Sequence, residues 1–135
     1  MKICYEQRPD ALALATDKLQ LSFPRGTTWI ASRYDDGSLA GVAVFTGVAK
    51  GNAFLHVAAV SPLWFSPEFC RAMFSHAFHS LSCRRLTASI AADNSACLRL
   101  ARRVGFREEG RLRGFDFGDL VMFGMLKEEC KWAES

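Results

Sequence analysis

The sequence lacks a long uncharged hydrophobic run. Its longest stretch without a formal charge covers residues 51–67, and this stretch contains Asn52, His56, two serines and two prolines. A helix that crosses a bilayer needs about 20 consecutive, mainly apolar residues. The opening residues, MKICYEQRPDALALA, also contain no continuous apolar segment followed by a small-residue cleavage site. We therefore expect neither a membrane span nor a secretory signal, and we expect a cytoplasmic protein.

Paired cysteines are missing as well. The five cysteines are an odd number, they form no CxxC pair and they show no metal-ligand spacing. Disulfides are rare in the reducing cytosol, and structural zinc sites use closely spaced Cys and His ligands. His76 and His79 lie three residues apart but have no evident third ligand. The sequence therefore predicts free thiols that act as small apolar side chains, and no metal site.

The composition shows no sign of disorder, of a repeat or of a second module. Half of the 135 residues are hydrophobic and 23% are charged, which is typical of a globular protein. The length matches one domain, so we expect a single domain over residues 1–135. Charge is uneven, because eight arginines but only three acids fall between Arg84 and Arg113. Such a surface suits a phosphate-bearing cofactor or a nucleic acid, or it is simply a solvated helix face.

The hydrophobic pattern predicts an α/β (α+β) fold. A short strand within residues 1–7 precedes a helix that begins at Pro9, and residues 27–34, 38–48 and 53–60 are rich in strand-forming residues. The turn sequences DDG and KGN join these three strands into an antiparallel meander.

The second half begins with a clear helix signal at Ser66, Pro67 and Glu68, which are a serine N-cap, a proline at the first helical position and an acid in the first turn. We expect this helix over residues 66–81 and a strand over residues 84–92. A second helix, capped by Asp93 or Asn94, ends at Val104, and two strands over 107–115 and 120–127 follow, with FGD as their turn. The result is a mixed, mostly antiparallel sheet of six to seven strands with helices on both faces.

The segment DNSACLRLARRVGFREEGRLR, residues 93–113, resembles the GNAT superfamily of N-acetyltransferases. In that family an asparagine ends a strand, a helix follows, and the sequence GF closes the helix and opens the next strand. Asn94 and Gly105-Phe106 occupy those places. The continuation REEGRLRGFDFGDLVMFGMLKEEC is similar to the branch of ribosomal-protein N-acetyltransferases, with its EG-x-x-R … D ending, and to small acetyltransferase-like proteins of tailed phages and prophages. The resemblance implies the GNAT fold, acetyl-CoA as co-substrate and an amine acceptor.

The resemblance also implies where acetyl-CoA binds. In the family, the strand before the first large helix separates from its neighbour, and a loop of the pattern R/Q-x-x-G-x-G/A holds the pyrophosphate at the helix N-terminus. Here that motif is absent, because Phe65, Glu68 and Cys70 stand at its three defining positions. Either Arg71 and arginines of the following helix compensate, or the cofactor site has decayed; Glu68 either repels the pyrophosphate or points to solvent.

The residues expected to contact acetyl-CoA are Ala59, Val60, Ser61, Phe65, Ser66, Phe69, Arg71, Asn94 and Cys97. Asn94 has two competing roles, since its amide can hydrogen-bond the pantetheine arm or cap the helix that follows. Main-chain amides near residues 59–61 are candidates to polarise the thioester carbonyl.

His56 is the candidate general base. It lies in the predicted strand 53–60, on the same strand face as Phe54, where the family's usual glutamate falls. A group of near-neutral pKa suits removal of a proton from an amine, whereas a histidine among apolar residues is often a hydrogen-bonded core residue. The family's usual acid, a tyrosine, is replaced by Ala101, and Tyr34 and Ser61 are distant substitutes.

The sequence thus favours a cytoplasmic N-acetyltransferase that moves an acetyl group from acetyl-CoA directly to an amine of a protein or a small molecule. The alternative is a catalytically degenerate GNAT-fold binding or assembly protein of phage origin. A nucleic-acid partner is not favoured, and a homodimer is left open. In the family, the acceptor pocket forms from the first helix region and the last hairpin.

Overall fold

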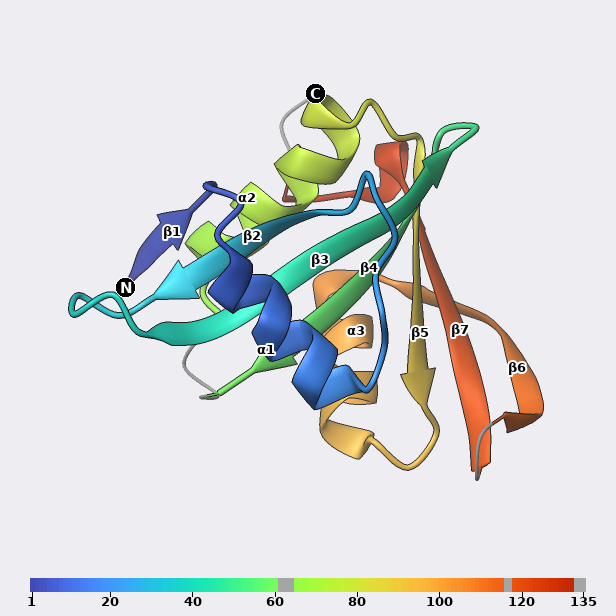
Figure 1. Ribbon diagram of the computed structural model, residues 1–135. Coiled ribbons are helices and arrows are strands. Elements are labelled where there is room, and N and C mark those ends of the chain that lie inside the picture. Colours follow the sequence, from blue (N-terminus) through green and yellow to red (C-terminus); the bar gives the residue numbers. More distant parts are fainter. Residues whose placement is uncertain (61–64, 116–117, 133–135) are drawn as a thin grey trace.

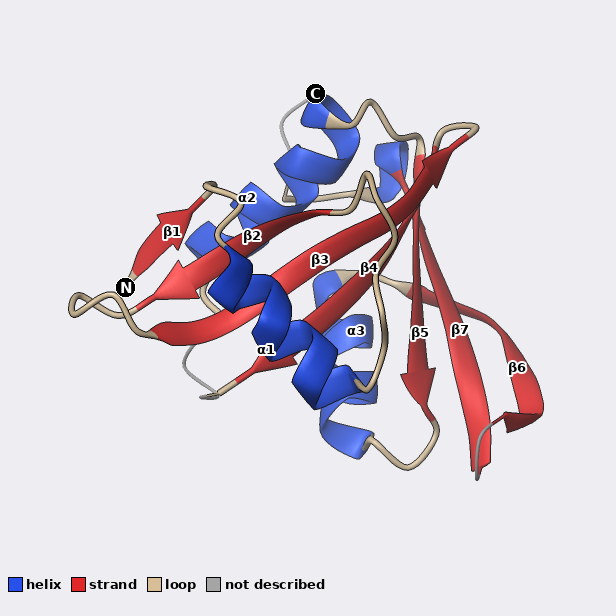
Figure 2. Cartoon of the chain, viewed as in Figure 1, coloured by secondary structure: helices blue, strands red, loops and turns tan. Residues whose placement is uncertain are grey.

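One seven-stranded sheet organises the chain, and helices lie on both of its faces (Figures 1 and 2). The computed structural model describes residues 1–60, 65–115 and 118–132. The strands are β1 (Lys2–Cys4), β2 (Thr28–Arg33), β3 (Leu39–Ala49), β4 (Asn52–Ala59), β5 (Arg85–Ala91), β6 (Arg107–Phe115) and β7 (Gly118–Leu126), in the order β1-β2-β3-β4-β5-β7-β6. The helices are α1 (Pro9–Leu19), α2 (Pro67–Ser75) and α3 (Ser95–Val104); a π-helical turn (His76–Ser80) continues α2, and a 3-10 turn (Lys127–Glu129) follows β7. The predicted fold class is confirmed.

The meander of β2, β3 and β4 is antiparallel throughout, as the turn sequences predict. Gly37 in the first turn has φ 89°, and Lys50 and Gly51 in the second have φ 53° and 78°. Two consecutive positive φ values are what a two-residue hairpin needs to match the twist of its strands. Local turn chemistry therefore sets the register of this half of the sheet.

The two faces of the sheet carry two separate apolar clusters. On one face, Ala11 and Ala15 of α1 are fully buried against Val42, Val44 and Ala58, and the small alanine side chains allow the helix to approach the strands closely. Figure 1 shows α1 crossing β3 and β4 on this face, whereas α2 and α3 lie behind the sheet. We call these the α1 face and the α2/α3 face.

The larger cluster fills the α2/α3 face. It contains aromatic and aliphatic side chains of both helices and of β3, β5 and β7, among them Phe45, Phe74, Phe78, Leu86 and Phe123. Phe106, which follows the end of α3, is buried here too. This cluster fixes the position of both helices relative to β4 and β5.

The ends of α2 and α3 follow the predicted caps. Ser66 Oγ accepts a hydrogen bond from Phe69 N at 3.1 Å, and Asn94 Oδ1 accepts one from Cys97 N at 3.2 Å. Gly105 ends α3 with φ 112°, a left-handed conformation that glycine adopts without strain. Side-chain capping of the first free N–H groups explains why both helices begin where they do.

Two predicted boundaries are wrong. The helix expected over residues 66–81 is α-helical only to Ser75, because the chain continues with wider turns in which Leu81 N donates to His76 O at 2.8 Å. The last hairpin turns earlier than expected, since β7 already begins at Gly118, so Gly118 and Asp119 belong to the strand. None of the described helices has the length and hydropathy needed to span a membrane.

Candidate active site

The strands β4 and β5 run side by side for only four residue pairs. They are parallel from Asn52↔Arg85 to Leu55↔Ala88. Beyond this point β4 continues along β3 as far as Ala59, while β5 stays with β7 as far as Ala91. Figure 1 shows the two strands diverging toward their carboxyl ends. A gap in the sheet therefore opens between residues 56–59 and residues 89–91.

A cleft of about 1460 Å³ occupies this gap. Part of its wall comes from the α2/α3 face, with Phe65, Met73, Cys97, Leu100 and Ala101. Another part comes from the α1 face and the segment that follows α1, with Leu19, Gln20, Leu21, His56 and Ser89. Because both faces contribute, the cleft passes through the sheet at the point where β4 and β5 separate.

His56 lies in the wall of this cleft, on the α1 face of β4. Its neighbour two residues along, Ala58, packs under α1, which confirms the predicted face. The ring is half-buried, and the ring of Phe23 lies against it at 5.6 Å between centroids. Burial lowers the pKa of His56 below its ordinary value of about 6.5, because the charged form loses hydration. The imidazole is therefore neutral near pH 7, the form that accepts a proton.

The Thr46 side chain contacts one nitrogen of the His56 ring. Its hydroxyl Oγ1 lies 3.2 Å from His56 Nε2, across the β3–β4 pair, and Thr46 itself is buried. The hydroxyl can accept a hydrogen bond from Nε2–H or donate one to a bare Nε2, and the two cases correspond to the two neutral tautomers of the ring. The arrangement leaves Nδ1 as the nitrogen that can meet a ligand in the cleft.

The backbone of β4 presents amides to the gap. Val60 N donates to Ala40 O of β3 at 2.8 Å. In an antiparallel pair, alternate residues direct both main-chain groups to the partner strand and the residues between them direct both groups away. The N–H groups of Val57 and Ala59 therefore point to the side where β5 has departed. The expectation that Val60 offers an amide here is wrong, because β3 already accepts its hydrogen bond.

The N-terminus of α2 differs from a phosphate-binding helix start. Pro67 has no N–H group, and the N–H of Phe69 already donates to Ser66 Oγ. Glu68 Oε1 lies 4.0 Å from Arg71 Nη2, and the two side chains are 68% and 56% exposed. Glu68 thus points to solvent beside Arg71, so the arginine that was expected to compensate for the lost loop also has an acid next to it.

Asn94 and Cys97, both predicted to contact acetyl-CoA, lie close together in the structure. Both line the cleft, at the junction between β5 and α3. Asn94 caps α3 through Oδ1, which leaves the Nδ2 donor of the same amide. Burial raises the pKa of the Cys97 thiol above its ordinary value, so it remains protonated near neutral pH.

The other predicted cofactor contacts are less direct. Phe69 is a fully buried core residue, because the first turn of α2 directs its ring into the larger cluster, and it is not among the described residues that line the cleft. Val60 is 57% exposed at the end of β4. Ala59 is half-buried against the core. Ser61 lies outside the described residues, and of the region between β4 and α2 the structure describes only Val60, Phe65 and Ser66. Phe65 lines the cleft.

One pair of cleft residues, Arg111 and Asp119, was not predicted from the sequence. Asp119 accepts hydrogen bonds from Arg111 Nη1 at 3.3 Å and from Gly114 N at 3.0 Å, and its carbonyl oxygen accepts one from Ala92 N at 2.9 Å. It therefore joins the last hairpin to the β5–α3 turn. Its signal in the sequence is the acid of the EG-x-x-R … D ending, but no local pattern indicates its partners.

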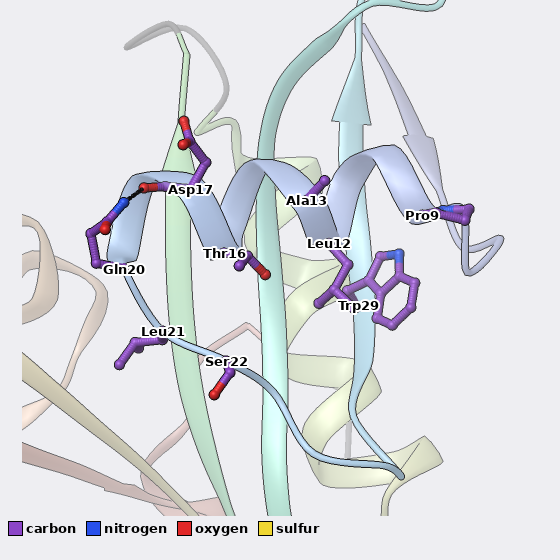
Figure 3. Close-up of a pocket in the computed structure, with 9 residues that line it drawn as sticks. All are labelled: Pro9, Leu12, Ala13, Thr16, Asp17, Gln20, Leu21, Ser22 and Trp29. Carbon is purple, nitrogen blue, oxygen red and sulfur yellow. Dashed lines mark hydrogen bonds between the residues drawn. The ribbon is translucent and has the colours of Figure 1, made fainter.

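A second groove of about 930 Å³ lies on the outer side of α1 (Figure 3). Leu12, Thr16 and Trp29 form its apolar part, and Leu21 and Ser22 of the segment after α1 form its other side. Gln20 and Leu21 line both the groove and the cleft, so this short segment separates the two.

In the described part of the chain, few side chains indicate a metal site or a second catalytic group. No cluster of three or more His, Cys, Asp or Glu residues that could hold a metal occurs there. His76 Nε2 lies 2.9 Å from Thr28 Oγ1, and its ring packs on Phe45, on the α2/α3 face away from the cleft wall. Tyr34 is not among the described residues of the cleft wall.

Comparison with known proteins agrees with this geometry. The family model "Acetyltransferase (GNAT) domain" matches residues 9–107. A Bacillus subtilis (strain 168) protein, "Putative ribosomal N-acetyltransferase YdaF", is 28% identical over an alignment of 108 positions that covers 70% of this chain and 57% of that protein's length.

Solved structures show the same fold. A mutant of spermidine N-acetyltransferase SpeG from Vibrio cholerae superposes with a TM-score of 0.67 at 17% identity, over 88% of this chain and 74% of that one. A chimera of SpeG reaches a TM-score of 0.71 at 14% identity, over 95% and 98% of the two chains. With the family model covering most of its length and the sheet opened between β4 and β5, the chain belongs to the GNAT family of acetyltransferases.

Proposed function

We propose that the chain is an N-acetyltransferase that moves an acetyl group from acetyl-CoA to an amine by direct transfer. The observation that carries this proposal is the cleft through the sheet, along which β4 presents a neutral, half-buried histidine and main-chain N–H groups. Membership in the GNAT family and the name of the relative YdaF support it.

The pantetheine arm of acetyl-CoA would lie in the gap between β4 and β5. Val57 and Ala59 offer main-chain N–H groups there, and Asn94 offers the Nδ2 donor that capping does not use. Phe65 and Cys97 contribute apolar wall. Ala59, Val60, Ser61, Ser66 and Arg71 remain proposed contacts for the part of the cofactor that lies toward α2.

His56 would act as the general base. The amine nitrogen attacks the thioester carbonyl carbon, and its proton passes to His56 Nδ1, directly or through one water. The N–H groups of the β4 edge would stabilise the negative charge that develops on the carbonyl oxygen. When the carbon–sulfur bond breaks, the CoA thiolate leaves and takes a proton from solvent, because Ala101 stands where a tyrosine acid is usual.

The altered start of α2 would weaken pyrophosphate binding without abolishing it. Ser66 Oγ occupies the Phe69 N–H, and the carboxylate of Glu68 adds negative charge close to the expected anion. Arg71 is the nearest compensating cation. We therefore expect acetyl-CoA to bind, with an affinity that depends on salt.

The basic surface is less available for nucleic acid than the sequence implied. Four of its eight arginines form ion pairs with acids, namely Arg85 with Glu109, Arg102 with Glu108, Arg107 with Glu129 and Arg111 with Asp119. Paired arginines release fewer counterions on binding a polyanion. All five cysteines are free thiols, which fits the proposed cytoplasmic location.

Calorimetry with acetyl-CoA and with desulfo-CoA tests the cofactor half of the proposal, and mass spectrometry of an acetylated amine tests the reaction. Mass spectrometry is preferable to a thiol reagent, because the protein's own cysteines would react with one. Binding of both nucleotides, with product formed only from acetyl-CoA, supports the enzyme. No binding at millimolar concentrations would favour a scaffold that binds or assembles with other proteins.

A further inference from the structure

The α1 side of the cleft, where an acceptor amine would meet His56, has an uncharged wall. On this face the described wall residues are Leu19, Gln20, Leu21, His56, Ser89, Ala91 and Leu120. The face of each strand residue follows from its neighbours: Ile90 and Val121 are buried on the α2/α3 face, so Ser89, Ala91 and Leu120 point the other way. Phe23 adds an aromatic surface against His56. We call this set the α1 mouth.

The charged residues of the described cleft wall are Asp93, Arg111 and Asp119, and none lies in the α1 mouth. Arg111 is opposite Val121 in the β6–β7 pair, so Arg111 and its partner Asp119 lie on the α2/α3 face. Asp93 is in the turn between β5 and α3. These acids are therefore not placed to receive a cation at the α1 mouth.

Another acid on the α1 face of the sheet, Glu109, is already paired with an arginine. Glu109 reaches over Gly124, where a Cβ atom would collide with the carboxylate, and forms a two-pronged ion pair with Arg85. Arg85 Nε also donates to Thr87 Oγ1, which donates to Asn52 Oδ1. This chain of contacts crosses from β6 to β4. The hydrogen bonds from the Arg85 guanidinium lower the pKa of Glu109. Both carboxylate oxygens accept from Arg85, so the negative charge of Glu109 is already balanced by a guanidinium.

Asp17 is not placed to bind a second ammonium group either. It lines the outer groove on α1, and Figure 3 shows its carboxylate directed away from Leu21. Leu21 is 43% exposed and lies at the border between groove and cleft. The entrance to the α1 mouth is therefore apolar as well.

From this distribution of charge we propose that the acceptor is a primary amine on an apolar carbon skeleton with no second cationic group. The inference rests on the proposed function and narrows its substrate class. The reacting amine gives up its proton, so it can enter an uncharged mouth. A second ammonium a few carbons away stays charged, and burying it without a counter-charge is unfavourable. Polyamines are therefore poor acceptors, although the SpeG proteins that share the fold are named for spermidine.

A matched pair of acceptors isolates the second charge. Hexylamine and hexane-1,6-diamine have the same carbon chain and differ only in the second amine; spermidine serves as a third acceptor. We expect kcat/KM for hexylamine to exceed that for the diamine by about tenfold or more, measured by mass spectrometry of the N-acetylated product.

Leu21→Glu supplies the missing counter-charge at the entrance. It should raise kcat/KM of the diamine relative to hexylamine by about two- to fivefold, the size expected for a partly exposed ion pair. Val48→Glu is the control, because Val48 has the same 43% exposure and is not among the described cleft residues. It should leave the ratio unchanged.

Equal or better acetylation of the diamine by the unaltered protein would overturn the inference, as would an equal effect of the two Glu variants. Binding of acetyl-CoA with neither amine acetylated would also overturn it and would leave the cofactor half of the proposed function standing. Absence of acetyl-CoA binding would instead reject the proposed function itself.

Discussion

The contact between Thr46 and His56 gives the sharpest test of the proposed mechanism. Thr46→Val keeps the shape of the side chain and removes one hydrogen bond of 3.2 Å to His56 Nε2. Such a bond contributes about 0.5–1.5 kcal/mol, so loss of ring orientation should lower kcat/KM by about two- to thirteenfold. His56→Gln should lower it by about 10²- to 10⁴-fold, the usual contribution of a general base.

The double variant separates a positioning role from an independent one. If Thr46 acts only through the ring, Thr46→Val should have no further effect once His56 is replaced by Gln, and the coupling should equal the whole effect of the single Thr46 change. Thr46→Ser keeps a hydroxyl and should restore most of the rate. Calorimetry should give acetyl-CoA affinities that are unchanged in all of these variants.

The pH profile identifies which nitrogen is the base. Activity should rise as pH rises through the pKa of His56, which burial places below its ordinary value. If Thr46 accepts a hydrogen bond from Nε2–H, it stabilises the protonated ring most, so Thr46→Val should move this limb to lower pH. A move to higher pH would mean that Thr46 donates to Nε2 and would refute Nδ1 as the base. A profile unaffected by His56→Gln would show that His56 is structural.

Three other predictions concern stability and cofactor affinity. Burial lowers the pKa values of His56 and His76 below those in the unfolded chain, so the unfolded state binds more protons. Tm should therefore be level between about pH 7 and 8 and fall as pH drops below about 6.5, less steeply in His76→Gln. Gly105→Ala should lower the free energy of unfolding, measured in urea, by about 1–2 kcal/mol. The cost comes from the backbone conformation at φ 112°, because a Cβ atom would meet Met125 Cε at an ordinary 3.5 Å. No change in the free energy of unfolding would mean that the loop relaxes. Glu68→Gln should tighten acetyl-CoA binding about two- to fivefold at low salt and less at high salt. Replacement of the exposed Glu128 by Gln is the control and should leave the affinity unchanged. Equal acetyl-CoA affinities of Glu68→Gln and the unaltered protein would place the pyrophosphate elsewhere.

Features set by a few neighbouring residues could be predicted from the sequence. The caps at Ser66 and Asn94, the end of α3 at Gly105 and the two meander turns each follow from short-range hydrogen bonds and from backbone conformations that particular residues favour. The strand face of His56 also followed, because side chains alternate strictly along a strand.

Features that depend on distant partners could not be predicted. Thr46 and Phe23 contact His56 from other elements, and nothing in their local sequence marks them. The direction of the Phe69 ring depends on how α2 packs, because that helix is apolar over a wide arc. The pairing of Arg85 with Glu109 needs the β-bulge after Glu108 and the absence of a side chain at Gly124.

The short ladder between β4 and β5 divides the hydrogen bonding of the sheet into two units. Strands β1 to β4 form one unit and strands β5, β7 and β6 the other, and four residue pairs join them. The seam, which is the β4–β5 ladder from Asn52↔Arg85 to Leu55↔Ala88, should open at a lower free energy than is needed to unfold either unit. Its amides should therefore exchange with deuterium before those at the centres of β3 and β7. A ligand that fills the gap would bridge both units and slow exchange along the seam, including at amides that it does not contact.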